Sequence, residues 1–127
     1  NMFWQDAHTH NFSVNNGAPD VSTIVTVPVD TDFREYIYPK VKITMGGTGG
    51  DVIIVNQTDD STRLTQLVGI SRYATVIMKG ELNYVSGQYY EKFSGRNFIR
   101  LLDGVNRFMV LGDIDTIKFE YSARRLM

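Results

Sequence analysis

Residues 98–127, FIRLLDGVNRFMVLGDIDTIKFEYSARRLM, decide the fold class of this chain. Within them, the segment 117–122, IKFEYS, alternates apolar and polar residues. A period of two residues is typical of a β-strand with one buried and one solvent-facing side. Asp103-Gly104 and Gly112-Asp113 are turn dipeptides, because glycine and aspartate tolerate positive φ. We therefore predict that the chain ends in a β-meander, with three strands joined by two tight turns.

The same alternation recurs upstream of this stretch. It is clear in STIVTVPVD (22–30) and in PKVKITM (39–45), whereas DVIIVN (51–56) and RFMVLG (107–112) are apolar on both faces and predict central strands covered on both sides. Weaker strands are expected at HNFSV (10–14), RLTQLV (63–68), ATVIM (74–78) and ELNYV (81–85). About ten strands at this spacing predict an all-β sandwich or barrel.

Prolines and glycines mark the ends of these strands. Pro28 and Pro39 fall inside strand-like runs, which predicts edge strands or bulges at both positions. GGTGG (46–50) reads as a flexible loop tip, and a single helical turn around QYYEKFSG (88–95) is the best helix candidate. Since no repeat or linker is visible, we expect one all-β unit over residues 1–127.

The composition bounds the possible partners. The chain has 127 residues, of which 43% are hydrophobic and 21% charged, with a net charge of −1 and no cysteine. These values predict one globular domain, and a near-neutral charge does not suggest a nucleic-acid partner. No apolar run approaches the roughly 20 residues of a membrane span, and NMFWQDAHTH (1–10) does not resemble a signal peptide. Because Asn1 precedes Met2, we expect a fragment of a longer chain.

Few residues suggest chemistry. His8 and His10, two positions apart on a strand, would point the same way with Asp6 beside them, which is one way to begin a zinc site. A catalytic zinc site usually needs three protein ligands, however, and the chain has no other histidine and no cysteine. We therefore predict a polar terminus rather than a metal site.

Loop carboxylates and glycines lead to the same expectation. Calcium could be held by aspartates in loops, but their spacing matches no EF-hand and aspartate is favoured in turns. These aspartates are Asp30, Asp32, Asp51, Asp59 and Asp60. GGTGG lacks the Lys-Ser/Thr of a P-loop, and no nucleophile elbow is present. We predict a protein that is not an enzyme and that has no catalytic residues, metal or cofactor.

The strongest binding signal is aromatic. Tyr84, Tyr89 and Tyr90 gather in NYVSGQYYEKF (83–93), where they would either stack on sugar rings and contact proteins or cover the end of the core. Arg124 and Arg125 in SARRLM would belong to a solvated tail or to a subunit contact. These five residues form our predicted interaction surface.

Most of residues 11–127 resembles the galectin-like C-terminal domain of the distal tail protein of siphophages, a phage tail component family. The most specific segment is NFIRLLDGVNRFMV (97–110), with an aromatic residue, a leucine and a Gly-x-Asn turn before a short apolar strand. Further similar segments are HNFSVNNGAPDVSTIVTV (10–27), YPKVKITM (38–45), DVIIVNQTDDSTRLT (51–65), ATVIMKGELNYV (74–85) and IKFEYSARRLM (117–127).

This resemblance implies a two-sheet antiparallel β-sandwich of jelly-roll, galectin-like type. It also implies a structural role in the virion, at the tail tip or baseplate hub, where the protein would join receptor-binding proteins to the tail tube. In the family a hexameric ring is built by an N-terminal belt domain that this chain lacks. The resemblance therefore implies a C-terminal fragment, and we expect the ring only in the full-length protein. Synthesis would occur in the cytoplasm of the bacterial host. The alternative is a carbohydrate-binding module for host cell-wall polysaccharide.

Overall fold

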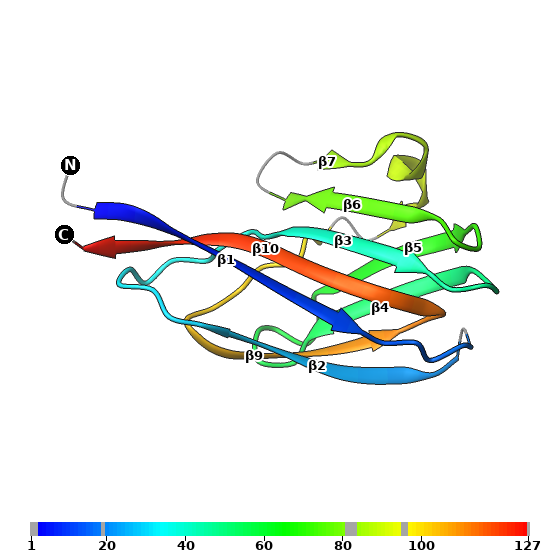
Figure 1. Ribbon diagram of the computed structural model, residues 1–127, viewed down its shortest axis with the longest axis horizontal. Coiled ribbons are helices and arrows are strands. Elements are labelled where there is room, and N and C mark those ends of the chain that lie inside the picture. The colour runs from blue at the N-terminus through cyan, green and yellow to red at the C-terminus, as the bar shows by residue number, and fades with distance from the viewer. Residues whose placement is uncertain (1–2, 19, 81–83, 95–96, 127) are drawn as a thin grey trace.

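The computed structural model describes residues 3–18, 20–80, 84–94 and 97–126 (Figure 1). In this part of the chain the fold is all-β, with one short 3₁₀ helix, η2 (Gly87–Lys92). The strands are β1 (Phe3–Ser13), β2 (Ser22–Val29), β3 (Lys40–Met45), β4 (Gly50–Asn56), β5 (Leu64–Ile70), β6 (Thr75–Lys79), β7 (Tyr84–Val85), β8 (Phe93–Ser94), β9 (Gly104–Leu111) and β10 (Ile114–Leu126). The predicted count of about ten strands is confirmed.

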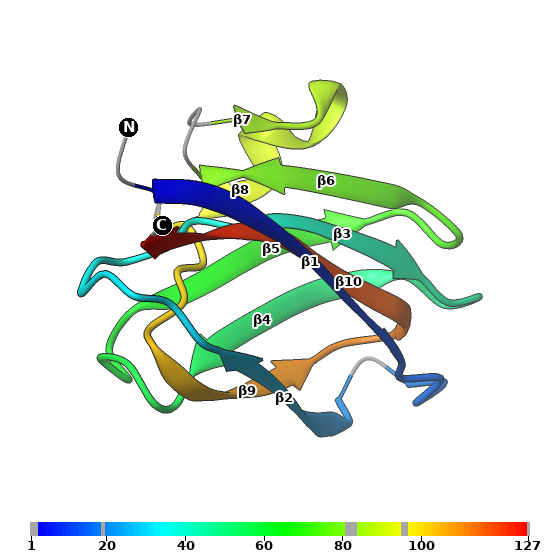
Figure 2. The same cartoon turned by 60° about the vertical axis from the view of Figure 1, so that its left-hand side comes forward.

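The strands form two five-stranded sheets that pack face to face (Figures 1 and 2). Sheet A has the order β1-β10-β3-β6-β7, and sheet B has the order β2-β9-β4-β5-β8. Every pairing is antiparallel. The predicted antiparallel β-sandwich is therefore confirmed. Its two sheets pack together because each has one apolar face that the other sheet covers.

The core follows the two-residue period of the strands. On β10, Ile117, Phe119, Tyr121 and Ala123 are buried while the residues between them are at least partly exposed. Phe119 stacks on Phe108 of the opposite sheet, with ring centroids 4.9 Å apart. Truncating a fully buried phenylalanine of this kind typically costs about 3–5 kcal/mol, so this pair fixes the two sheets to each other.

The prediction that the chain ends in a β-meander is wrong. β9 belongs to sheet B and β10 to sheet A, so Gly112-Asp113 carries the chain from one sheet to the other. Gly112 has φ +145°, and a Cβ there would lie 2.8 Å from the carbonyl oxygen of Asp51. The buried carboxylate of Asp113 accepts hydrogen bonds from the backbone N–H groups of Thr48 and Gly49, both at 2.7 Å. The crossing is thus stabilised by the GGTGG loop.

The prediction of a hairpin at Asp103-Gly104 is also wrong, because residues 98–102 form no strand beside β9. Leu101 makes only an isolated bridge with Ile37. The side chain of Asn106 takes the place of a ladder: its Oδ1 accepts from the N–H of Leu102 at 2.8 Å, and its Nδ2 donates to the carbonyl of the same residue at 2.8 Å. Gly104, at φ +100°, begins β9.

Pro28 lies in β2, an edge strand of sheet B, as predicted. Pro39 only precedes β3, which is a central strand, so its predicted edge position is wrong.

β4 and β9 are central in sheet B, but their outward side chains Ile53 and Met109 stay partly exposed because a sandwich covers only one face of each sheet. The single helical turn is confirmed as η2. Of the ELNYV strand, residues 81–83 lie outside the described residues, and the rest is β7.

Candidate functional site

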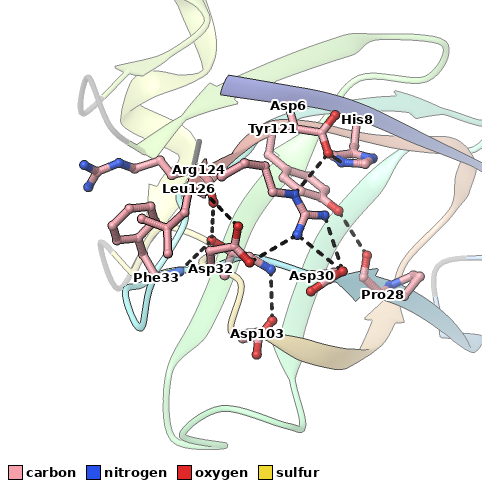
Figure 3. Close-up of polar contacts among 12 residues, drawn as sticks. Asp6, His8, Pro28, Asp30, Asp32, Phe33, Asp103, Tyr121, Arg124 and Leu126 are labelled. Carbon is pink, nitrogen blue, oxygen red and sulfur yellow. Dashed lines mark hydrogen bonds and ion pairs between the residues drawn. The ribbon is translucent and has the colours of Figure 1, made fainter. Parts of the chain in front are cut away.

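The N-terminal end of β1 and the C-terminal end of β10 lie side by side at one end of the sandwich (Figure 1). A group of polar side chains joins them there to the loop that follows β2 (Figure 3). We call this group the terminal cluster. It consists of Asp6, His8, Asp30, Asp32, Tyr121 and Arg125.

Strand alternation brings the histidine side of β1 onto the buried face of β10. His8 pairs in register with Tyr121, and their rings stack with centroids 5.3 Å apart. His8 Nε2 lies 2.9 Å from Asp6 Oδ2, and the histidine donates because an ionised carboxylate only accepts. The Tyr121 hydroxyl donates to the carbonyl of Pro28 in sheet B at 3.0 Å. The prediction that His8 and His10 share a face with Asp6 is confirmed, since both imidazoles stack on Tyr121.

Arg125 is the cation of the terminal cluster. Its guanidinium lies 3.4 Å from Asp6, 3.3 Å from Asp30 and 3.7 Å from Asp32. The Asp32 carboxylate also accepts from the backbone N–H of Leu126 at 2.9 Å. The last strand of sheet A is thereby tied to the loop that leaves sheet B, which keeps the two layers in register at their open end.

The electrostatics of the terminal cluster fit a structural ion-pair network. The hydrogen bond from His8, together with Arg125, lowers the pKa of Asp6 despite some burial. Burial disfavours the charged guanidinium of Arg125, but Asp30 and Asp6 outweigh it and raise its pKa. Burial, and to a lesser degree His8, lowers the pKa of His10. Among the described residues no group of three or more His, Cys, Asp or Glu is arranged to hold a metal ion.

A polar groove of about 600 Å³ crosses the outer face of sheet A. It is bordered by β1, β10 and residues 35–38, and we call it the sheet A groove. Tyr36 and Tyr38 line it with 47% and 38% of their surfaces exposed. Lys40 pairs with Glu120 in it at 3.6 Å. The sheet A groove therefore combines aromatic surface with both signs of charge.

Tyr36 is held in place by a chain of charged contacts. The guanidinium carbon of Arg100 lies 3.7 Å from the centre of the Tyr36 ring. Arg100 in turn donates to both oxygens of Asp59, at 2.6 and 3.1 Å. The bond from Arg100 holds the pKa of Asp59 below its usual value. Since only 7% of the Asp59 side chain is exposed, this pair orders the segment that carries Tyr36.

The predicted interaction surface does not assemble as expected. Tyr89 is in the hydrophobic core with 9% of its surface exposed, so it cannot stack on a ligand. Tyr84 lies in β7 and Tyr90 in η2, and their side chains lie outside the described part of the structure. Arg124 and Arg125 are in β10, which continues to Leu126, so a solvated tail is wrong for them. Their role in binding another molecule stays a prediction.

Arg124 also contacts this chain's own loop. Its Nη1 lies 3.4 Å from Glu35, and its guanidinium carbon lies 4.3 Å from the ring centre of Phe33. The exposed Tyr36 and Tyr38 were missed in the sequence. The alternation in Tyr36-Ile37-Tyr38, with Ile37 packed on the core, is the signal that could have revealed them.

The part of the chain that the structure describes is a two-sheet sandwich with interlocked terminal strands and a groove on sheet A. The phage tail C-terminal domain family matches residues 3–121, and the chain belongs to this family. It is therefore a phage tail domain, located in the tail of the virion, where it contacts other tail proteins. No curated protein and no solved structure matches the chain. No helix among the described residues is long and apolar enough to cross a membrane.

Proposed function

We propose that this domain is a rigid docking module of the phage tail tip or baseplate hub, which holds receptor-binding proteins on the tail tube. The observation that carries the proposal is the sheet A groove, in which the exposed Tyr36 is positioned by the Arg100–Asp59 pair. The proposed place in the tail is that of the galectin-like domain of a distal tail protein. A preceding belt domain in the full-length protein would form the hexameric ring.

The composition of the sheet A groove suits a protein partner. Tyrosine and arginine are enriched at the centres of protein interfaces, because they offer a large rigid surface with a polar edge. Tyr36 is fixed through Arg100, so little side-chain entropy is lost when a partner covers its ring. The Lys40–Glu120 pair at the floor gives a partner both donors and acceptors. Preorganisation of this kind raises affinity without a larger contact area.

Repetition in the tail would strengthen each contact. If several copies are held in a ring, a modest affinity of each groove becomes a tight attachment through effective concentration. A rigid two-sheet domain is suited to this arrangement, because its groove keeps one orientation relative to the ring.

The direct experiment measures binding between this domain and the receptor-binding protein of the same phage by isothermal titration calorimetry. The double variant Tyr36→Ser/Tyr38→Ser should weaken binding at least about tenfold, since aromatic anchors typically contribute more than 1 kcal/mol each. Tyr73→Ser is the matched control, because Tyr73 is 71% exposed and lies outside the sheet A groove. Equal affinity of the double variant and the native domain would contradict the proposal.

A carbohydrate-binding role is the second candidate, and the exposed tyrosines beside hydrogen-bonding side chains favour it. Sugars stack on such rings and use the neighbouring charges as hydrogen-bond partners. The same variants, titrated with purified host cell-wall polysaccharide, separate the two roles. Saccharide binding that is lost in Tyr36→Ser/Tyr38→Ser and kept in Tyr73→Ser would select this candidate.

A further inference from the structure

The outer edge of β1 is a long run of backbone groups without a neighbouring strand among the described residues. β1 pairs with β10 over eleven residues with no shift in register. The N–H of Val14, just beyond β1, donates to the carbonyl of Asp115 at 2.8 Å. Because bonding alternates along an antiparallel pair, the even-numbered residues of β1 bond to β10, and the odd-numbered ones direct their N–H and C=O groups to the open edge.

The far side of β10 gives the same assignment independently. The carbonyl of Arg124 accepts from the N–H of Asp32, and the N–H of Leu126 donates to the Asp32 carboxylate. The backbone N–H and C=O groups of even-numbered residues of β10 therefore point away from β1, and those of odd-numbered residues point toward it. Since odd residues of β10 are in register with even residues of β1, the backbone groups of Gln5, Ala7, Thr9 and Asn11 point outward.

The other edges in the described structure are protected and this one is not. β2 contains Pro28, which cannot donate to a ladder, and β7 and β8 have two residues each. β1 has no proline, lysine, arginine or bulge. Asp6 points inward, which is one known way to guard an edge, but His8 and Arg125 already neutralise it.

The sequence of β1 is chemically symmetrical about His8. Residues at equal distances on either side of His8 are of matching or complementary kinds. These pairs are Trp4 with Phe12, Gln5 with Asn11, Asp6 with His10, and Ala7 with Thr9. An antiparallel pairing of two identical strands about His8 places each residue of a pair opposite its counterpart on the same face.

We propose that β1 pairs antiparallel with β1 of a second copy of this chain, with the two-fold axis at His8, so that the two A sheets become one continuous sheet. Ala7 and Thr9 then exchange backbone hydrogen bonds with Thr9 and Ala7 of the second copy, which uses the groups that face the open edge. Asp6 lies opposite His10 of the second copy. Charge and hydrogen-bonding complementarity thus select the second copy as the occupant of this edge.

Trp4 gains a partner in the same arrangement. In the single chain it is 50% exposed, and it shares a face with Asp6 and His8. Phe12 is half-buried and packs edge-on against Phe119, with ring centroids 6.0 Å apart. The register about His8 puts Trp4 beside Phe12 of the second copy, which covers an exposed indole with an aromatic ring that is already anchored to a core.

Single-cysteine cross-linking tests the register, because the chain has no native cysteine. In His8→Cys the two cysteines form a non-hydrogen-bonded pair with Cα atoms about 4.5 Å apart, which permits a disulfide. In the control Gln5→Cys the two cysteines are separated by about 20 Å along the strands. We expect oxidation to yield covalent dimer in His8→Cys and none in Gln5→Cys. Equal cross-linking of both variants, or none in His8→Cys that circular dichroism shows to be folded, would overturn the proposal.

Sedimentation equilibrium of the native domain and of an edge variant tests the same contact without cysteines. Thr9→Pro removes an outward N–H but no bond to β10, and Thr9→Val keeps the N–H. Two lost hydrogen bonds per dimer should raise the dissociation constant of Thr9→Pro about 30-fold, while Thr9→Val stays within about threefold. A native domain that remains monomeric up to about 1 mM, where a contact would be weaker than about 4 kcal/mol, would exclude the pairing.

Discussion

Replacing Asn106 by alanine should cost more stability than replacing any exposed polar residue of the domain. Asn106 has 0% of its surface exposed, and four of its side-chain hydrogen bonds are 3.2 Å or shorter. Its Oδ1 accepts from Leu102 N–H at 2.8 Å and from Asn56 Nδ2 at 3.0 Å, and its Nδ2 donates to the carbonyls of Leu102 at 2.8 Å and Val27 at 3.2 Å. In the Asn106→Ala variant the groups that face this side chain, apart from Asn56 Nδ2, lose a buried partner.

The magnitude follows from these contacts. A net contribution of about 1 kcal/mol for each of four bonds predicts a loss of about 4 kcal/mol in the free energy of unfolding. Domains of this size are stable by only about 5–15 kcal/mol, so the variant should be close to unfolding at 37 °C. Asn56 retains its bond to the carbonyl of Arg100, which keeps the loss from being larger.

Urea denaturation followed by tryptophan fluorescence and far-ultraviolet circular dichroism measures this loss. With a slope of about 1.5–2 kcal/mol/M, the midpoint should fall by about 2–2.7 M. Asn11→Ala is the control, because Asn11 is an exposed strand asparagine and should change stability by less than about 0.5 kcal/mol. A loss below about 1.5 kcal/mol for Asn106→Ala would refute the view that this side chain replaces a strand ladder.

Three further changes should show which polar contacts stabilise the fold. Arg100→Met should lower the free energy of unfolding by about 2 kcal/mol at pH 7. The lowered pKa of Asp59 contributes stability above pH 3.8, its ordinary pKa, and this stability is lost as the pH falls through the pKa of the folded state. Unfolding free energies measured from pH 2 to 7 should therefore depend less on acid in the variant. Asp113→Ala should cost about 2 kcal/mol and expose the GGTGG loop to limited proteolysis, since two backbone N–H groups lose a buried acceptor. Gly112→Ala should destabilise the domain by a similar amount in urea, because its Cβ meets the Asp51 carbonyl at a φ that alanine rarely adopts.

The strands were predictable because their signal is local. Alternation at Val25, Val27 and Val29 reports one buried face whatever lies opposite it, and these three side chains are all in the core. The number of strands and the sandwich class follow from many such runs. Pro28 marked an edge for the same reason, since the absence of an N–H is a property of the residue itself.

The connections were not predictable because they depend on contacts distant in sequence. Gly112 reports a sharp turn, but only its approach to Asp51 and the bonds of Asp113 to the GGTGG loop show that the chain changes sheets there. Asp103 reads as a hairpin residue, whereas its carboxylate accepts from the N–H of Thr31 at 3.1 Å. Local propensity cannot rank these alternatives, because both satisfy the same turn geometry.

The inward position of Tyr89 was not predictable for a similar reason. Tyr89 is one of several tyrosines in a short segment, and nothing in the sequence says which of them packs inward. The alternation in Tyr36-Ile37-Tyr38 is a local signal of exposure, but the groove that the two tyrosines line exists only once β1 and β10 are paired in sheet A. Only part of the terminal cluster could be predicted from the sequence. The spacing of His8 and His10 predicted a shared face, but Arg125 is 119 residues from Asp6, and their contact depends on the β1–β10 pairing.

The side-by-side ends of β1 and β10 have a mechanical consequence. A load applied between the N-terminal end of β1 and the Ile114 end of β10 pulls the two strands along their length, so the hydrogen bonds of the β1–β10 pairing carry the force together in shear. The same load applied between the two ends of the chain would peel the rungs apart one at a time, beginning beside Arg125. The β1–β10 pairing therefore resists a pull along the strands much more strongly than a pull that separates the two chain ends.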